Sequence, residues 1–250
     1  MNKEGITVAG NLIADVVYTI HVYPQIRNLT WMRNPVAHTG GINNLIIDLA
    51  RLDSKIPIKV SGVVGDDENG QFIVDSLREY PNINIEGIVK KGRTAVTFAM
   101  TEKESKQRTF FFDPGTSLEF NEKQIDFKKI KADIFHLEYL LLLGTLDQPD
   151  EDYGTKAAKV LATAQKYEME TSVDMVSEEG NRYQKVVWPA LKYTDYCVVN
   201  EVEGTGVTGI QLYDKDGIKE ENMRKGLEKL KEFGVKKWAI IHSPACGYGL

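Results

Sequence analysis

The feature that most constrains this chain is the alternation of short, mainly apolar runs with amphipathic segments along most of its length. Short apolar runs are typical of buried strands, and apolar residues three and four positions apart are typical of helices. The predicted strands are 6–10, which ends at a glycine, 60–64, 134–137, 171–174, 196–200 and 238–241. Buried strands separated by helices predict an α/β protein with a mostly parallel sheet and helices on both faces.

Two stretches, 16–38 and 94–112, depart from this pattern. Polar and apolar residues alternate in them with a period of two, which predicts antiparallel strands with one exposed face. We expect these strands in a small sheet outside the core, as a lid or a contact between subunits; an edge extension of the main sheet fits equally well. No repeat or linker divides the chain, so a single domain spanning 1–250 is expected.

The composition argues against several classes of function. Lys and Arg number 31 against 36 Asp and Glu, and neither sign forms a long block, so no nucleic-acid partner is expected. The longest leucine run, 140–143, is far shorter than the roughly 20 residues of a membrane helix, and the N-terminus lacks a secretory pattern. Cys197 and Cys246 each adjoin an apolar run, which predicts buried free thiols and a cytoplasmic location.

Polar residues follow the predicted strands, where ligands bind in open α/β sheets. Asp15 comes soon after the first strand and could accept hydrogen bonds from ligand hydroxyls, or serve as a turn residue. Gly40 and Gly41 precede a predicted helix that buries residues from Ile42 to Leu52. Bare backbone there would let a ligand approach free helix amides, although a glycine turn with an Asn cap fits equally well.

Asn200 and Glu203 follow another strand. An amide and a carboxylate at one rim suit a Mg²⁺ ion that keeps its waters, or simply an acidic helix start. His136 has no partner at metal-ligand spacing and is predicted to be a hydrogen-bonded core or surface histidine. The chain lacks G-x-S-x-G and Walker A motifs, which disfavours serine hydrolysis and P-loop chemistry.

Taken in order, these segments resemble the ribokinase-like carbohydrate kinases of the phosphofructokinase-B type over essentially the whole chain. The resembling segments are 10–15, the glycine pair with Asn44 and 47–52, 65–70, 108–112 with Gly115, and 200–203. The resemblance implies a Rossmann-like α/β core with a small β lid over the sugar. It also implies transfer of the γ-phosphate of ATP, with Mg²⁺, to a hydroxyl of a sugar or nucleoside.

The resemblance also implies roles for individual residues. It assigns contacts with the sugar substrate to Asp15, Gly40, Gly41, Asn44 and Glu138. It assigns contacts with the nucleotide phosphates to Asn200, Glu203 and His242, with Glu203 organising the metal through water. Lid strands of this kind imply a homodimer that pairs through the lid.

The chain also departs from the family pattern. The spacing from the glycine pair to Asn44 is one residue shorter than usual, and Pro244, which has no amide to donate, stands where the family contacts phosphate. The glycine-rich segment carrying the catalytic Asp does not occur, so no catalytic residue is assigned and a longer kinase is expected. Two alternatives stay open: a non-catalytic sugar- or nucleotide-binding protein on the same fold, and a nucleoside kinase.

Overall fold

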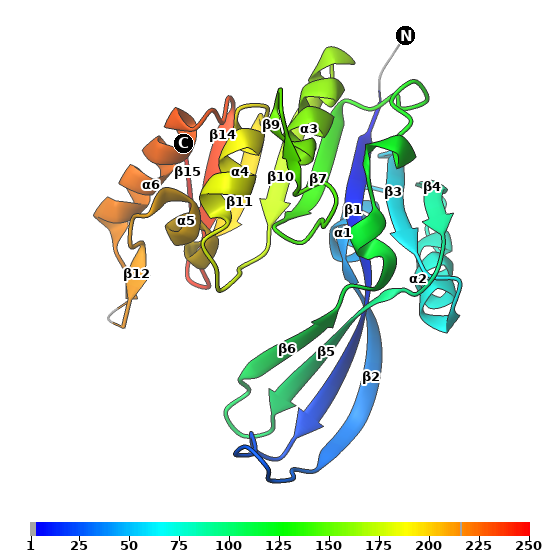
Figure 1. Cartoon of the computed structure of the whole chain (residues 1–250), viewed down its shortest axis with the longest axis vertical. Helices are drawn as coiled ribbons and strands as arrows, with labels where there is room; N and C mark the ends of the chain where they lie inside the picture. The colour runs from blue at the N-terminus through cyan, green and yellow to red at the C-terminus, as the bar shows by residue number, and fades with distance from the viewer. Residues whose placement is uncertain (1–3, 216) are drawn as a thin grey trace.

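A computed structural model describes residues 4–215 and 217–250, and its centre is one long, mostly parallel sheet (Figure 1). The strands of this sheet, in spatial order, are β15 (Gly247–Gly249), β14 (Trp238–His242), β11 (Tyr196–Asn200), β10 (Glu170–Met175), β7 (Ile134–Leu140), β1 (Ile6–Ile20), β3 (Ile58–Val64) and β4 (Ile83–Lys90). All neighbours from β14 to β4 are parallel, and β15 alone in this order is antiparallel to its neighbour. The predicted fold class is confirmed.

Helices cover the two halves of the sheet from opposite sides. The first half packs against α1 (Ile42–Leu52) and α2 (Glu68–Arg78), which bury Ile46 and Ile73 against β1 and β3. The second half packs against α3 (Lys156–Lys166), α4 (Tyr183–Leu191), α5 (Glu201–Thr208) and α6 (Glu220–Glu232). The expectation that helices cover both faces is therefore correct for the sheet as a whole, but each half has its α-helices on one face.

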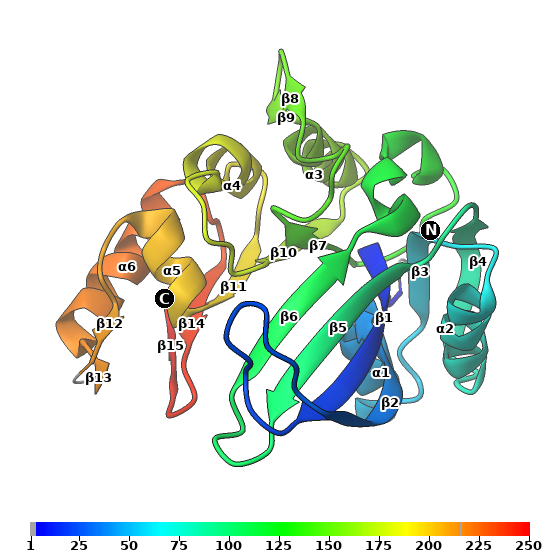
Figure 2. The same cartoon turned by 60° about the horizontal axis from the view of Figure 1, so that its bottom comes forward.

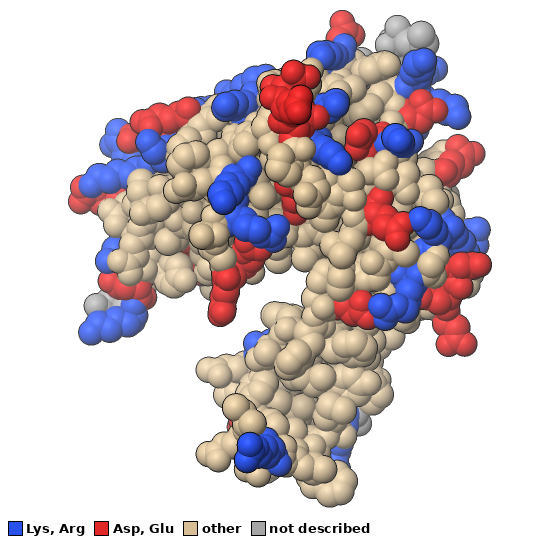
Figure 3. All heavy atoms as spheres, in the orientation of Figure 1, with Lys and Arg blue, Asp and Glu red and all other residues tan. Residues whose placement is uncertain are grey.

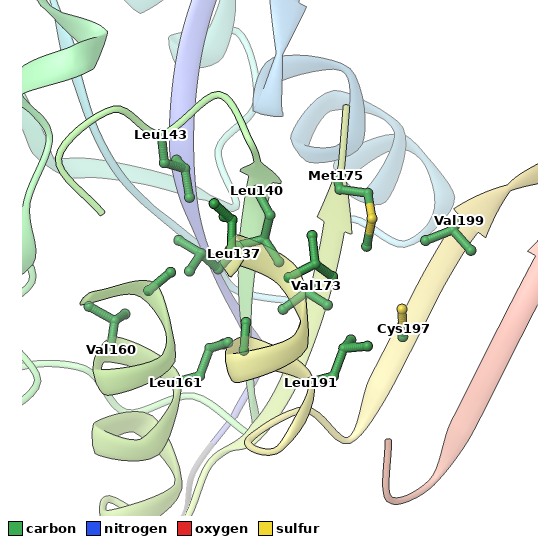
Figure 4. Close-up of a cluster of buried hydrophobic side chains, with 14 of the residues drawn as sticks. Leu137, Leu140, Leu143, Val160, Leu161, Val173, Met175, Leu191, Cys197 and Val199 are labelled. Carbon is green, nitrogen blue, oxygen red and sulfur yellow. The ribbon is translucent and has the colours of Figure 1, made fainter. Parts of the chain in front are cut away.

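The larger core lies between the second half of the sheet and its helices. Figure 4 shows Leu137, Val173 and Cys197, from β7, β10 and β11, on one side of it. Leu161 of α3 and Leu191 of α4 face them, and all five side chains are buried. Burying such a side chain stabilises a fold by about 1.5–3 kcal/mol, so this cluster holds the strands that carry the site in place.

The first strand does not end at Gly10, contrary to the sequence prediction. It leaves the main sheet after Asn11 and continues to Ile20, between β2 (Met32–Gly41) and β5 (Ala95–Glu102), while β6 (Arg108–Asp113) pairs with β5. We call residues 13–20, 32–41, 95–102 and 108–113 the lid. Figure 1 shows that it projects from the edge where the parallel strands of the main sheet end.

The lid pairs its strands in a mixed fashion. β2 is antiparallel to β1 and β6 is antiparallel to β5, but β1 and β5 are parallel, which the predicted antiparallel pattern did not anticipate. Parallel neighbours need a long connection, and here it passes through α1, β3, α2 and β4. Residues distant in sequence therefore meet in the lid.

Short elements complete the fold. They are the 3₁₀ helices η1 (Gly115–Glu119) and η2 (Glu122–Gln124) and the two-stranded pairs β8 (Pro149–Asp150) with β9 (Gly154–Thr155) and β12 (Tyr213–Asp214) with β13 (Gly217–Ile218). Figure 2 shows β8 and β9 projecting beside α3, away from the lid. In the described part of the chain, no helix has the length and apolar character that crossing a membrane requires.

Two burial predictions are wrong. Leu52 is 81% exposed, because α1 ends there and Ala50 takes the buried position in the last turn. Cys246 is an exposed free thiol in the turn between β14 and β15, whereas Cys197 is buried as expected. The apolar run 238–241 forms β14, and Cys246 lies four residues beyond its end at His242, in an exposed turn.

Candidate functional site

Asp15 lies in the lid rather than in a turn after the first strand. β1 places it between His38 of β2 and Thr97 of β5, with its side chain half-buried. Burial raises the pKa of Asp15, and the nearby Thr97 hydroxyl and His38 act in the opposite direction. A half-buried carboxylate with a free side is suited to accept hydrogen bonds from ligand hydroxyls.

The glycine pair joins the lid to α1 next to this carboxylate. A Cβ at Gly40 would overlap the Asp15 carboxylate, and Gly41 has a φ of 63° at the N-terminus of α1. No side chain caps the amides of this helix, and the Asn43 side chain instead donates to the Gly40 carbonyl at 2.7 Å. Of the two asparagines, Asn43 is buried and Asn44 is exposed, so Asn44 is the one available to a ligand.

Asp15 and Asn44 line one pocket of about 560 Å³ between the lid and α1. The other residues that line it are Val17, His38, Thr39, Ile47, Asp48, Arg51, Ala99 and Arg108. Gly40 packs directly beside the Asp15 carboxylate, and Gly41 packs beside the backbone of Asn11 on the same strand. Four of the five predicted substrate residues thus lie close together. Figure 3 shows the hollow between the lid and the rest of the molecule.

The fifth predicted substrate residue, Glu138, lies elsewhere. It is buried at the end of β7, where its carbonyl approaches Gly10 so closely that a Cβ there would clash. Glu138 lines a second pocket, of about 370 Å³, next to Leu45 and Leu49 of α1. The first pocket is lined by other residues of α1, so Glu138 and Asp15 line different pockets against the same helix.

His136 holds the Glu138 carboxylate in place. Its Nε2 lies 2.8 Å from Glu138 Oε2, and its Nδ1 lies 2.9 Å from the Ser172 hydroxyl of β10. The prediction that this is a hydrogen-bonded core histidine is confirmed. These three side chains lie on the face of the sheet opposite the larger core, because they alternate with Phe135, Leu137 and Val173 along their strands.

Asn200 and Glu203 form a capping box at the start of α5. The Asn200 side chain accepts from the Val202 and Glu203 amides at 2.8 and 2.9 Å. Glu203 Oε1 accepts from the Asn200 side chain and the Ser177 hydroxyl, and Oε2 accepts from the Asn200 amide. Each carboxylate oxygen has two lone pairs, so Oε2 retains one for a further partner.

His242 lies beside this capping box at the end of β14, where it pairs with Asn200 in the sheet. Its side chain is exposed. Burial raises the pKa of Glu203, and the nearby His242 partly opposes this shift. Ser243 is not free in the same way, because its hydroxyl accepts from the Ala245 and Cys246 amides within the turn. His242 is therefore the residue of this turn that can reach an anionic ligand.

Asp174 is a site residue that the sequence reasoning missed. It lies at the end of β10, lines the second pocket with Glu138, and has its pKa raised to about 8 by burial and then by the carboxylates of Glu138 and Glu203. Its position at the end of a predicted strand was a signal that could have identified it. Three carboxylates, from β7, from β10 and from the first turn of α5, thus influence one another.

Among the described residues, no group of three or more His, Cys, Asp or Glu side chains is placed to hold a metal ion, so Glu138, Asp174 and Glu203 do not form a closed metal cage. Magnesium usually binds one or two carboxylates and keeps several waters. Burial raises the pKa of Asp174, the Glu138 and Glu203 carboxylates raise it further, and Glu203 Oε2 has a spare lone pair. Asp174 and Glu203 are the residues that would hold the ion.

Comparison with known proteins adds a family and a set of similar folds. The family model described as pfkB family carbohydrate kinase matches residues 15–248. A search of curated protein sequences found no match. Among solved structures, ribokinase from Giardia lamblia has a TM-score of 0.74 at 16% identity over 95% of this chain and 69% of that one.

Two further solved structures carry ligands in their descriptions. The ribokinase of Arabidopsis thaliana, complexed with ribose and ATP, has a TM-score of 0.72 at 16% identity over 96% of this chain and 72% of that chain. The fructokinase of Xylella fastidiosa, with bound ATP, has a TM-score of 0.69 at 18% identity over 99% and 77%. At these identities the likeness shows a shared fold.

Proposed function

The chain belongs to the pfkB family of carbohydrate kinases, and on that basis we propose that it transfers the γ-phosphoryl group of ATP to a hydroxyl of a sugar bound at Asp15. The observation that carries the proposal is the pocket under the lid that Asp15 and Asn44 line, with Gly40 packed against the Asp15 carboxylate. A carboxylate accepts from two hydroxyls, and an amide both donates and accepts, so together they orient a polyhydroxy ligand.

The nucleotide would lie at the other rim, along the ends of β10, β11 and β14. There Asn200 and Glu203 form a rigid capping box, and the exposed His242 offers a donor to phosphate oxygens. Magnesium, when bound, supplies charge neutralisation on the phosphates. Asp174 and Glu203 would hold it, and the buried His136 keeps Glu138 oriented beside them.

Two observations favour a second candidate, a sugar-binding protein without turnover. Glu203 already accepts three hydrogen bonds from protein groups, and Pro244 has no amide for a phosphate. A nucleoside kinase is less well supported, because the pocket walls include none of Tyr18, Trp31 and Phe98, the aromatic candidates for stacking a base. Of these, Trp31 lines a different pocket near the lid tip, and Phe98 lines one beside Asp67.

The test combines calorimetric titration with a panel of sugars and with ATP·Mg²⁺ and a coupled assay of ADP release. We expect saturable binding of a sugar, and ADP formation that depends on that sugar. Binding of both ligands without ADP release would support the non-catalytic alternative. Absence of binding by any sugar would contradict both.

We also propose that the chain is a cytoplasmic protein of one domain and forms a homodimer through the lid. The lid exposes large apolar side chains, including Phe110 at 62% and Phe111 at 56% exposure, on the edge strand β6. Exposed apolar edge strands favour pairing with another chain. Sedimentation should show a dimer that Phe111→Ser weakens and that Leu52→Ser, at an exposed site outside the lid, leaves unchanged.

A further inference from the structure

The pocket under the lid contains two guanidinium groups that the proposed function does not use. Arg51 comes from α1, and Arg108 comes from the start of β6, so they approach the pocket from opposite walls. Asp15 lines the same pocket, together with one other carboxylate, Asp48. The charges of the four groups balance overall, but their positions differ.

The guanidinium of Arg108 has no counterion in the described part of the chain. It forms no ion pair and no hydrogen bond with the described residues, and the side chain is exposed. Four other arginines of the chain each pair with a carboxylate, namely Arg78, Arg93, Arg182 and Arg224. An unpaired guanidinium on a pocket wall retains all five of its N–H donors for a ligand.

Arg51 is held in place by an aromatic side chain rather than by an acid. Its Nε donates to the Tyr80 hydroxyl at 2.9 Å, and its guanidinium lies 5.7 Å from the centre of the Tyr80 ring. These contacts fix the orientation of the group and leave its two terminal nitrogens without a protein partner among the described residues. Asp48 lies one turn earlier on α1 and partly offsets this charge, so Arg108 is the less compensated of the two.

The arginines lie at the far end of the pocket from the predicted sugar residues. Arg51 is seven residues beyond Asn44 on α1, about 10 Å along the helix axis. On the lid, Asp15 aligns with Thr97 and Thr97 with Phe112, and Arg108 is four residues from Phe112, about 13 Å along the strand. A long ligand that places its hydroxyls at Asp15 would therefore extend toward Arg108.

We propose that the sugar bound by this chain carries an anionic substituent, a carboxylate or a phosphate, and that Arg108, with Arg51, binds that group. The inference rests on the proposed function, since it takes Asp15 as the site of the sugar hydroxyls. A guanidinium presents two parallel N–H donors that match the two oxygens of either anion. Arg108 is then the residue that separates anionic from neutral sugars.

The test is calorimetric titration of the whole chain with two matched pairs of ligands at one fixed, low salt concentration. One pair is D-fructose and D-fructose 6-phosphate, and the other is D-glucose and D-glucuronate. We expect the anionic member of one pair to bind about 10- to 100-fold tighter than its neutral partner, the range for a charge-assisted hydrogen bond. The pair that shows the preference identifies phosphate or carboxylate as the group.

Substitutions locate the preference. Arg108→Gln should abolish it without weakening the neutral sugar, and Arg108→Lys, which keeps the charge but not the fork, should retain part of it. Arg224→Gln, an exposed arginine on α6, is the control and should keep the full preference. The melting temperature of each variant shows whether it is folded.

Three results would overturn the inference. Neutral sugars that bind as tightly as both anionic ones would exclude an anionic substrate and leave the proposed function standing. A preference that persists in Arg108→Gln would show that another group binds the anion. Failure of all four ligands to bind, when another neutral sugar of the panel does bind, would overturn this inference and leave the proposed function standing, whereas failure of every sugar would contradict the proposed function itself.

Discussion

The carboxylate of Asp15 occupies the space that a side chain at Gly40 would need. The two residues lie on neighbouring strands of the lid, where Asp15 pairs with His38 and Gly40 pairs with Ile13. Gly40 therefore lets the carboxylate lie flat against the backbone just before α1 begins. This contact links the glycine pair, which the sequence identifies, to the carboxylate that is proposed to bind the sugar.

Gly40→Ala should weaken sugar binding far more than it weakens the fold. The added methyl group would displace the Asp15 carboxylate, which is the end of a flexible side chain, and the backbone of Gly40 is not in the left-handed region. We expect the sugar affinity to fall about tenfold or more and the free energy of unfolding to change by about 1 kcal/mol. Calorimetry and thermal melting measure the two effects.

Gly247→Ala is the matched control for this substitution, because a Cβ at Gly247 meets no atom within 4 Å. It should change neither sugar affinity nor the melting temperature appreciably. A Gly40→Ala variant that binds sugar as the wild type does would show that Asp15 is not the contact.

Asp15→Ala should reduce sugar binding by about 2–4 kcal/mol and leave ATP binding nearly unchanged. A ligand whose two hydroxyls lose their acceptor is left with unpaired groups in the pocket, which costs about that much. Separate titrations with the sugar and with ATP·Mg²⁺ give the two affinities. Equal losses for both ligands would indicate a general disturbance of the structure, and no loss for the sugar would refute the role of Asp15.

Glu203→Gln should lower the affinity for Mg²⁺·ATP and also reduce stability by about 1 kcal/mol, because the side chain closes the capping box of α5. Ser177→Ala removes one hydrogen bond to the same carboxylate while keeping its charge. Comparison of the two variants separates the effect of the carboxylate's charge on Mg²⁺·ATP binding from the effect of its orientation. A magnesium titration of ATP binding that is the same in Glu203→Gln as in the wild type would exclude the metal role.

The contributions of Asp147 and Asp174 to the stability of the protein should fall as the pH rises from about 4 to about 8. Burial raises the pKa of Asp147 to about 6, and burial with neighbouring carboxylates raises the pKa of Asp174 to about 8. A carboxyl group with a raised pKa binds its proton more tightly in the folded state. Its stabilising contribution is complete below its unfolded pKa and is lost as the pH rises through its folded pKa.

Asp174→Asn should remove the part of this loss that lies nearest pH 8, since an amide stays neutral. We expect a gain in the free energy of unfolding on the order of 1–3 kcal/mol at pH 8 and little change at pH 4. Urea unfolding at the two pH values measures it, with the exposed Asp152→Asn as the control. A gain of equal size at both pH values would contradict titration of Asp174 as the cause.

Much of the main sheet could be predicted because strand and helix periodicity is written in consecutive residues. The apolar runs at 134–137 and 196–200 lie in β7 and β11, and the glycine pair does precede a helix. The predicted end of the first strand at Gly10 was wrong, because β1 continues beyond this residue. Gly10 instead allows the backbone to lie close to the carbonyl of Glu138. A glycine marks either a turn or a close approach, and periodicity does not distinguish them.

The sequence by itself determined the α/β class, the family, and which polar residues follow strands, because each of these depends on local order along the chain. Only the tertiary structure decided which of those residues meet. The extension of β1 into the lid carries Asp15 away from Glu138. Parallel strand packing brings Asp174 near Glu138 and Glu203. The position of the lid beside α1 places Arg108 and Arg51 on the walls of one pocket. Such meetings depend on strand register and packing between distant segments, which no short stretch of sequence encodes.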